Sequence, residues 1–181
     1  MEVISSPIAD VKIIQPKVFG DERGFFMETF RVDWFKEHCA DVEFVQDNHS
    51  KSAHGILRGL HYQLEQTQGK LVRVTSGAVY DVAVDMRKSS KTFGTWFGVE
   101  LSAQNARQLW VPAGFAHGFY VISDSAEFVY KCTDYYHPAS EVSLAFDDPT
   151  LKIDWPFAGE APITSSKDAQ GYALADAPVF D

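Results

Sequence analysis

The sequence predicts an all-β protein, a sandwich or barrel built from many short strands. From Val11 to about Leu144 the chain is a succession of short apolar or alternating runs, and Gly, Ser, Asn or Asp separates one run from the next. Helical periodicity is confined to one short segment. With 45% hydrophobic and 14% aromatic residues, the 181-residue chain can bury the core that such a fold needs.

Nine runs are expected to form the strands. They cover 11–19, 25–30, 43–48, 55–63, 70–76, 78–86, 95–101, 107–112 and 126–134. The run over 78–86 alternates, and one of its faces carries Tyr80, Val82, Val84 and Met86. Asp81 and Asp85 fall on the opposite face, so this strand is expected to bury apolar groups on one side and to place carboxylates on the other.

The remaining elements are one helix and an irregular tail. Over 31–38 the apolar and aromatic residues recur at helical spacing, which predicts a short structural helix. The tail over 149–181 carries four of the eight prolines and is expected to wrap the core without regular structure. No internal repeat or low-complexity linker divides the chain, so we expect a single domain over 1–181.

The charge and the cysteine content of the chain bear on which classes of ligand it can bind and on its cellular compartment. Sixteen Lys and Arg against 25 Asp and Glu give a net charge of −9, which disfavours broad nucleic-acid binding. Cys39 and Cys132 are too few and too far apart for a disulfide framework or a zinc site, so we expect reduced thiols and a cytoplasmic protein. No segment has the pattern of a signal peptide or a membrane span.

The run GILRGLHYQ over 55–63 combines two groups that could carry chemistry, Arg58 and His61. Arg58 offers the forked guanidinium that suits a phosphate, and His61 titrates near neutral pH. Their odd spacing puts them on opposite faces of an ideal strand, unless Gly59 marks a bulge that redirects one of them. A structural or merely exposed His61 is the alternative.

A second histidine, His117, lies in VPAGFAHGF, where Pro112, Gly114 and His117 form the Pro-x-Gly-x-x-His pattern of the second cupin motif. Metal-binding cupins also carry a first motif with two histidines. Here His61 fits the first of these positions, but Gln63 occupies the second. Since an amide is a poor replacement for an imidazole ligand, a bound catalytic metal is disfavoured.

Without a metal, four side chains supply the parts for proton transfer next to a carbonyl: His61, Lys70, Tyr130 and Asp168. A neutral imidazole can remove a carbon-bound proton, an ammonium can stabilise the enolate oxygen, and a phenol can return a proton from the other face. A carboxylate behind the imidazole would fix its tautomer. Each residue also has an ordinary structural alternative: a solvated lysine, a core tyrosine and a turn-forming aspartate.

Blocks along nearly the whole chain resemble the dTDP-4-dehydrorhamnose 3,5-epimerase family. They are FGDERGFFMETF (19–30), VQDNHSKSAHGILRGLHYQ (45–63), QGKLVRVTSGAVYDVAVDMRKSS (68–90), LWVPAGFAHGF (109–119), EFVYKCTDYY (127–136), IDWP (153–156) and SSKDA (165–169). The resemblance implies a cupin-like double-stranded β-helix, or jelly-roll barrel, with a few short helices. It implies no cofactor.

The resemblance also implies a role for each matching residue. His61 matches the general base, Asp168 its partner carboxylate, Tyr130 the general acid, and Lys70 the group that stabilises the enolate. The nucleotide and sugar contacts of the family fall on Arg23, Phe26, Glu28, Gln46, Asp47, Asn48, Arg58, His117, Tyr136, Glu141 and Lys167. A few cations gathered in one cleft let an acidic protein bind a diphosphate.

The family assembles as a dimer that exchanges N-terminal strands, and this resemblance implies a homodimer here. For Arg23, in the turn Gly-Asp-Glu-Arg-Gly, the alternative from the residues alone is a solvated hairpin tip paired with Asp21 or Glu22.

The function expected from this resemblance is inversion of C3 and C5 of dTDP-4-dehydro-6-deoxy-D-glucose in dTDP-L-rhamnose synthesis. Three alternatives stay open. The protein could invert only one of the two carbons or act on a related 4-keto sugar nucleotide. It could be a metal-dependent cupin enzyme built on His61 and His117, or a module that binds the sugar nucleotide without catalysis.

Overall fold

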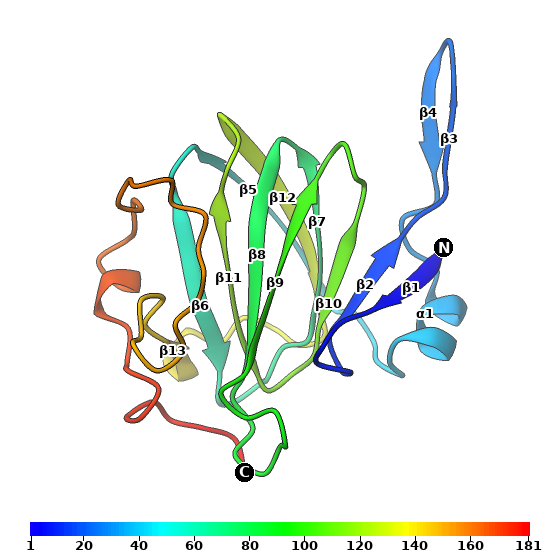
Figure 1. Ribbon diagram of the computed structural model, residues 1–181. Helices are drawn as coiled ribbons and strands as arrows, with labels where there is room; N and C mark the ends of the chain where they lie inside the picture. Colours follow the sequence, from blue (N-terminus) through cyan, green and yellow to red (C-terminus); the bar gives the residue numbers. More distant parts are fainter.

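A computed structural model describes all 181 residues and shows two facing β-sheets with one α-helix (Figure 1). The strands are β1 (Glu2–Ser5), β2 (Lys12–Gln15), β3 (Val18–Asp21), β4 (Gly24–Met27), β5 (Gln46–Ala53), β6 (Leu57–Gln63), β7 (Lys70–Ser76), β8 (Ala78–Asp85), β9 (Trp96–Ser102), β10 (Gln108–Val111), β11 (Phe115–Val121), β12 (Ser125–Cys132) and β13 (Glu141–Ser143). The helices are α1 (Val32–His38) and two single 3-10 turns, η1 (Pro138–Ser140) and η2 (Asp168–Gln170). No helix has the length and apolar character needed to cross a membrane.

The sheets are antiparallel, and each mixes strands that are distant in the sequence. One has the order β1-β2-β10-β7-β12-β5, and the other has the order β13-β6-β11-β8-β9. The all-β, cupin-like prediction is therefore confirmed, although the two sheets face each other without joining into one closed ladder. β3 and β4 form a separate two-stranded hairpin that projects away from the sandwich (Figure 1).

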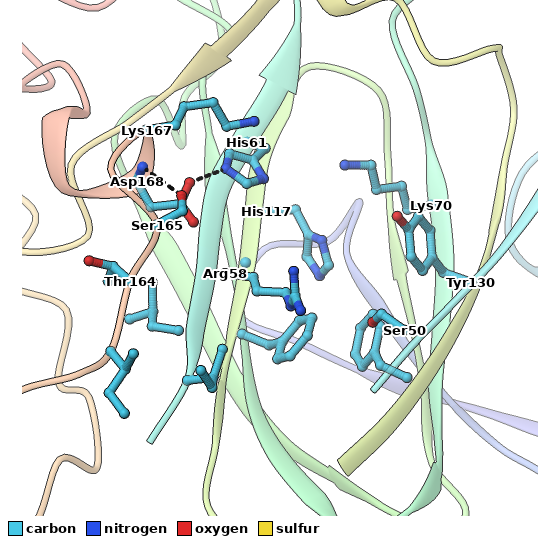
Figure 2. A pocket seen from close by; sticks show the side chains of 16 residues that line it. Ser50, Arg58, His61, Lys70, His117, Tyr130, Thr164, Ser165, Lys167 and Asp168 are labelled. Carbon is cyan, nitrogen blue, oxygen red and sulfur yellow. Dashed lines mark hydrogen bonds and ion pairs between the residues drawn. The ribbon is translucent and has the colours of Figure 1, made fainter. Parts of the chain in front are cut away.

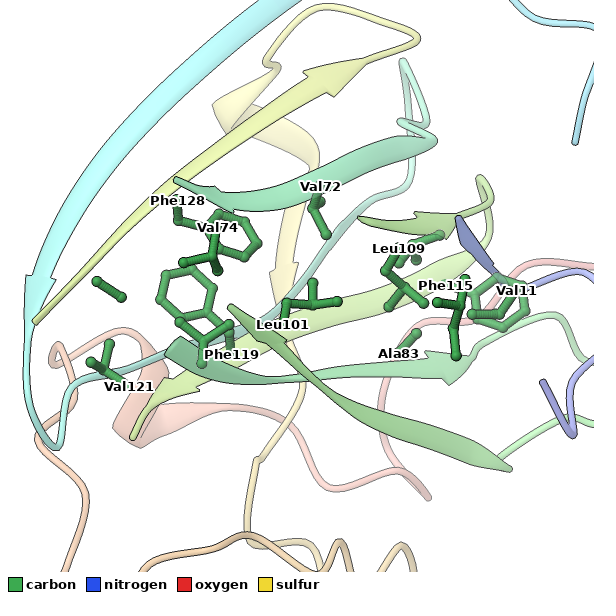
Figure 3. Packing of buried hydrophobic residues seen from close by; sticks show 14 of the residues in the cluster. Val11, Val72, Val74, Ala83, Leu101, Leu109, Phe115, Phe119, Val121 and Phe128 are labelled. Atoms are coloured by element: carbon green, nitrogen blue, oxygen red, sulfur yellow. The ribbon is translucent and has the colours of Figure 1, made fainter. Parts of the chain in front are cut away.

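The main core lies between the two sheets (Figure 3). Val72 and Phe128 of the six-stranded sheet face Ala83 and Phe119 of the five-stranded sheet, and all four are buried. The rings of Phe119 and Phe128 stack with their centroids 4.3 Å apart. This packing fixes β11 and β12 opposite each other and forms the apolar floor of the cavity described below.

Each sheet also buries part of its outer face. On the five-stranded sheet, Val82 and Val84 of β8 pack with Trp155 of the tail, as the alternation over 78–86 predicts. On the six-stranded sheet, Phe35 of α1 packs edge-on against Trp110 of β10. The expected helix over 31–38 is thus present one residue shorter, and its apolar side is what holds it to the sheet.

Some strands differ from the sequence prediction. The run over 11–19 is split at Pro16 into β2 and β3, because proline has no N–H to continue a ladder. The run over 43–48 is shifted, since β5 covers Gln46–Ala53. β11 was not among the expected strands. All seven of its residues are buried between β6 and β8. The sequence of this strand therefore lacks the alternation of polar and apolar residues from which a strand is predicted.

The tail is joined to β6 of the five-stranded sheet by backbone hydrogen bonds. Leu57 of β6 donates its backbone N–H to the carbonyl of Ile163, and Ile163 in turn donates to the carbonyl of Gly55. The side chains of Leu151 and Trp155 are buried against the sheet's outer face. These contacts bring the 163–168 segment beside β6, where it forms one wall of a cavity.

Candidate active site

A cavity of about 460 Å³ opens between the sheets and is the main cavity of the molecule. Its walls come from β5, β6, β7, β11, β12 and the tail segment 163–168 (Figure 2). It brings together seven of the residues expected in the site, which are Arg58, His61, Lys70, His117, Tyr130, Lys167 and Asp168.

A bulge in β6 lets Arg58 and His61 face this cavity together. His61 pairs with His117 and Arg58 pairs with Phe119, so two residues of β6 oppose the single residue Gly118 of β11. Gly59 has a φ of +121°, and a Cβ there would lie 2.6 Å from the Cα of Gly118. Only glycine fits this conformation and this close approach. The bulge that the sequence required for a shared site is therefore present.

His61 is held by a carboxylate from the tail. Its Nε2 donates to Oδ1 of Asp168 at 2.5 Å, and Asp168 is buried. The backbone N–H of Asp168 is bound in turn by the hydroxyl of Ser165 at 3.2 Å. Burial is the largest single influence on Asp168 and opposes its ionisation, but the hydrogen bond and charge of His61, with the hydrogen bonds from Ser165 and Gly59, together outweigh it and lower the pKa of this carboxyl. The pair leaves Nδ1 as the nitrogen of His61 that is free to take a proton.

Lys70 and Tyr130 lie across the main cavity from His61 (Figure 2). They come from the paired strands β7 and β12, in which Lys70 is opposite Cys132 and Tyr130 is opposite Val72. Burial lowers the pKa of Lys70, although Cys132, Glu141 and Asp81 act against this shift. Burial raises the pKa of Tyr130, so its phenol keeps its proton at neutral pH.

A second carboxylate, Glu141, lies on the other side of His61. Its Oε1 is 4.0 Å from Nδ1 of His61. Its Oε2 accepts hydrogen bonds from Lys167 at 2.7 Å and from the hydroxyl of Tyr136 at 2.9 Å. Burial opposes ionisation of Glu141, and these two hydrogen bonds reverse that effect and lower its pKa. His61 therefore lies between two carboxylates.

Two residues of the main cavity, His117 and Arg58, each have a polar partner that is not part of its lining. His117 is bound through Nε2 to Oδ1 of Asp81 at 2.8 Å, and both residues are buried. Burial raises the pKa of Asp81 despite this partner. Arg58 donates from Nε to the hydroxyl of Ser52 at 2.9 Å, which leaves its two terminal nitrogens for a ligand. The sequence analysis did not include Asp81 or Ser52 among the site residues. Asp81 could have been suspected, because it is a charged residue within the apolar run over 78–86.

The other expected contacts lie at the edge of the site or outside it. The register of β5 and β12 places Asn48 opposite Tyr130 and Gln46 opposite Cys132, on the cavity side of the sheet. Asp47 alternates to the outer face and pairs with Lys131 at 3.0 Å. Arg23, Phe26 and Glu28 lie on or beside the exposed β3–β4 hairpin, and none of them lines the main cavity of its own chain. Arg23 is paired there with Asp21, as the alternative reading of the sequence has it.

The donor groups do not form a metal-binding set. No three His, Cys, Asp or Glu side chains are placed to hold one ion. Gln63 is buried and turned to the backbone, since its amide donates to the carbonyls of Gln66 and Tyr135 and accepts from the N–H of His137. His61 and His117 are each bound to a carboxylate of their own. The arrangement suits proton transfer and binding of an anion.

Comparison with known proteins gives one consistent family. The family model for dTDP-4-dehydrorhamnose 3,5-epimerase matches residues 5–176. A relative of that name from Pseudomonas aeruginosa is 57% identical over 99% of each chain. One from Neisseria gonorrhoeae is 60% identical over 98% of this chain, which spans only 54% of that longer relative. A crystal structure of the epimerase from Legionella pneumophila, in complex with dTDP-4-keto-L-rhamnose, is 56% identical, covers 98% of this chain and 94% of its own, and superposes with a TM-score of 0.95. The chain belongs to the dTDP-4-dehydrorhamnose 3,5-epimerase family.

Proposed function

We propose that this epimerase inverts C3 and C5 of dTDP-4-dehydro-6-deoxy-D-glucose to give dTDP-4-dehydro-L-rhamnose, a step of dTDP-L-rhamnose synthesis. One observation carries the proposal. An imidazole bound to a buried carboxylate faces an ammonium and a phenol across a single cavity, within a chain of this family. The ligand of the Legionella structure has the identity of the proposed product.

The proposed chemistry assigns one job to each of these groups. Nδ1 of His61 removes the proton from a carbon next to the C4 ketone, because Nε2 is already bound to Asp168. The ammonium of Lys70 stabilises the oxyanion that forms at C4. Tyr130 then returns a proton to the opposite face of the carbon from the facing sheet. C3 and C5 both flank the same ketone, so one base, one oxyanion donor and one acid serve both inversions, and this chemistry needs no cofactor.

The binding roles follow the positions of the charged groups. Arg58, His117 and Lys167 line the main cavity and supply donors for the diphosphate and the sugar. Gln46 and Asn48 continue this lining along β5, and Tyr136 and Glu141 close it near His61. Asp47 faces outward on β5 and would reach the nucleotide only at the rim.

We propose further that the protein is a homodimer and that its β3–β4 hairpin completes the site of the partner. The hairpin projects from the sandwich (Figure 1). Its Phe19, Phe25 and Phe26 side chains are exposed. An extended hairpin with exposed aromatic rings is typical of a segment that is covered in an assembly. Arg23 and Phe26, with the nearby Glu28, would then meet the nucleotide in the partner's cavity. Cys39 and Cys132 are both free, which supports a cytoplasmic setting.

Proton exchange in heavy water tests the activity. The protein is incubated with dTDP-4-dehydro-6-deoxy-D-glucose in D₂O, and proton NMR follows the loss of signal at C3 and C5. We expect deuterium to enter at both carbons with the wild-type protein and at neither carbon with His61→Ala. Exchange at one carbon would replace the proposal with a single-carbon epimerase. Binding without exchange would contradict catalysis on this substrate.

A further inference from the structure

His61 and Tyr130 do not return to their starting protonation states when one inversion ends. Under the proposed function, on which this inference rests, each inversion moves a proton from carbon to His61 and another from Tyr130 to carbon. The imidazole is left cationic and the phenol is left as a phenolate. A second inversion needs a neutral His61 and a protonated Tyr130. One proton must therefore pass from Nδ1 of His61 to the oxygen of Tyr130 before the site can act again.

The main cavity is poorly suited to carry this proton. The sugar must lie between His61 and Tyr130 for the two groups to act on opposite faces of one carbon. Asp168 is not a way out either, because it is bound to Nε2 and its other carboxylate oxygen faces the N–H of Gly59 at 3.5 Å. The return path has to leave His61 from Nδ1, on the side away from Asp168.

Glu141 is the acceptor on that side. Its Oε1 lies 4.0 Å from Nδ1 of His61, a separation that a small side-chain movement or one water molecule closes. Its Oε2 is fixed by the hydroxyl of Tyr136 at 2.9 Å and by Lys167 at 2.7 Å. The Glu141 side chain is 14% exposed, so its charge is largely shielded from solvent. Glu141 thus joins the base to a second phenol.

A small chamber connects this carboxylate to the acid. It has a volume of about 80 Å³ and adjoins the main cavity in which the sugar would lie, with His61, Lys70 and Tyr130 lining both. His61, Lys70, Tyr130, Tyr136 and Glu141 all line it. Since about 10–15 Å³ of such water-accessible space is enough for one water molecule, the chamber has room for water. Its polar lining satisfies the condition that buried water needs several hydrogen-bonding partners.

We propose that Glu141, Tyr136 and the water of this chamber form a relay that returns the proton from His61 to Tyr130 after each inversion. The imidazolium gives up the proton at Nδ1 to the Glu141 side, and the chain delivers a proton to the phenolate of Tyr130. Both groups become neutral, no net charge is gained or lost, and the transfer runs from the stronger acid to the stronger base. Glu141 acts through His61 and Tyr130 and is a positioning residue for proton return.

The substitution Glu141→Gln tests the relay, because the amide keeps the size of the side chain and cannot carry a proton. Rapid-quench experiments in D₂O, with enzyme in excess and then with substrate in excess, separate the first inversion by each enzyme molecule from all later ones. We expect later inversions to slow at least tenfold more than the first inversion does, whatever loss of binding the substitution adds to both. A role limited to binding or folding would slow both phases equally.

Chemical rescue gives a second readout that a structural role would not move. Formate is small enough for the chamber and can carry a proton, so it should restore later inversions in Glu141→Gln without changing the first. Glu127→Gln is the matched control, since Glu127 pairs with His49 on the outer face and lies outside the chamber. Its two phases should match the wild type. Tyr136→Phe should slow the later inversions in the same way, because it removes the second hydroxyl of the path.

The outcomes separate this inference from the proposed function. If wild-type protein exchanges no proton, the proposed function fails. The relay is wrong, and the epimerase assignment stands, if wild-type protein inverts its substrate but the first and later inversions slow by the same factor in Glu141→Gln and formate restores neither. The variant must be folded by circular dichroism and must bind dTDP for this comparison.

Discussion

The imidazole of His61 and the carboxylate of Asp168 are 107 residues apart in the chain and 2.5 Å apart in the fold. One belongs to the middle of β6 and the other to the single turn η2 of the tail. The hydrogen bond sets the tautomer of His61 and stabilises the imidazolium that forms when it takes a proton. In the proposed mechanism, Asp168 thereby decides which nitrogen of His61 faces the substrate.

Asp168→Asn should leave the fold intact and lower kcat at least a hundredfold, because an amide cannot balance the imidazolium charge. Affinity for dTDP should change little, since the carboxylate points to His61 and away from the phosphate-binding groups. Steady-state kinetics and calorimetric titration with dTDP measure the two effects. Asp176→Asn, on an exposed part of the same tail, is the control. A parallel loss of dTDP binding in Asp168→Asn would contradict the assigned role.

Tyr130→Phe should separate proton removal from proton return. Without the phenol, the enolate can be reprotonated only from the side of His61, so the carbon regains its original configuration. In D₂O the recovered substrate should carry deuterium while the inverted product falls at least a hundredfold. Proton NMR of substrate and product shows both. Loss of exchange to the same extent as loss of inversion would place Tyr130 in the first step instead.

Lys70 should set the alkaline limit of activity. Burial lowers the pKa of Lys70, so its ammonium loses its proton at a pH below the ordinary lysine value of about 10.4. The neutral amine cannot stabilise the C4 oxyanion, and kcat should fall as pH rises through that lowered pKa. Lys70→Arg keeps a positive charge and should move the alkaline fall in kcat to higher pH. If kcat falls at the same pH in Lys70→Arg as in the wild type, another group controls this fall.

Mixed dimers should reveal whether the β3–β4 hairpin acts on the partner. Arg23→Ala and His61→Ala proteins, each nearly inactive alone, are unfolded together and refolded as a mixture. If Arg23 serves the partner's cavity, half of the dimers contain one complete site of two, and about a quarter of wild-type activity should return. Recovery to no more than the average of the two parents would place Arg23 in the site of its own chain.

The sequence was sufficient for the fold class and for several local features. Helical spacing revealed α1, which has one buried side, and alternation revealed β8, which is largely buried on both faces but carries Asp81 and Asp85 on one face only. The same logic fails for β11, which is buried on both faces and has no such alternation of charge. Gly59 showed that a bulge was possible, but the redirection of His61 depends on the close passage of Gly118, which no local pattern encodes.

The site itself was predictable only in part. The resemblance assigned roles to its residues, and the proposed chemistry also depends on pairings between distant segments. Asp81 with His117 and Glu141 with His61 are examples, since each is fixed by strand register rather than by spacing in the chain. Arg23 shows a different limit. Its neighbours within one chain are those of a surface hairpin, and any other environment must come from a second chain.

The attachment of the tail makes the 163–168 segment part of the proposed catalyst. Asp168 and Lys167 follow both sheets in the chain, and the segment before them is held to β6 by the backbone hydrogen bonds between Leu57, Ile163 and Gly55. A polypeptide released before Asp168 lacks the carboxylate that orients the base, whatever the condition of its two sheets. In the proposed mechanism, catalytic competence therefore begins only after Asp168 has been synthesised, and products truncated before this residue cannot compete for turnover of the substrate.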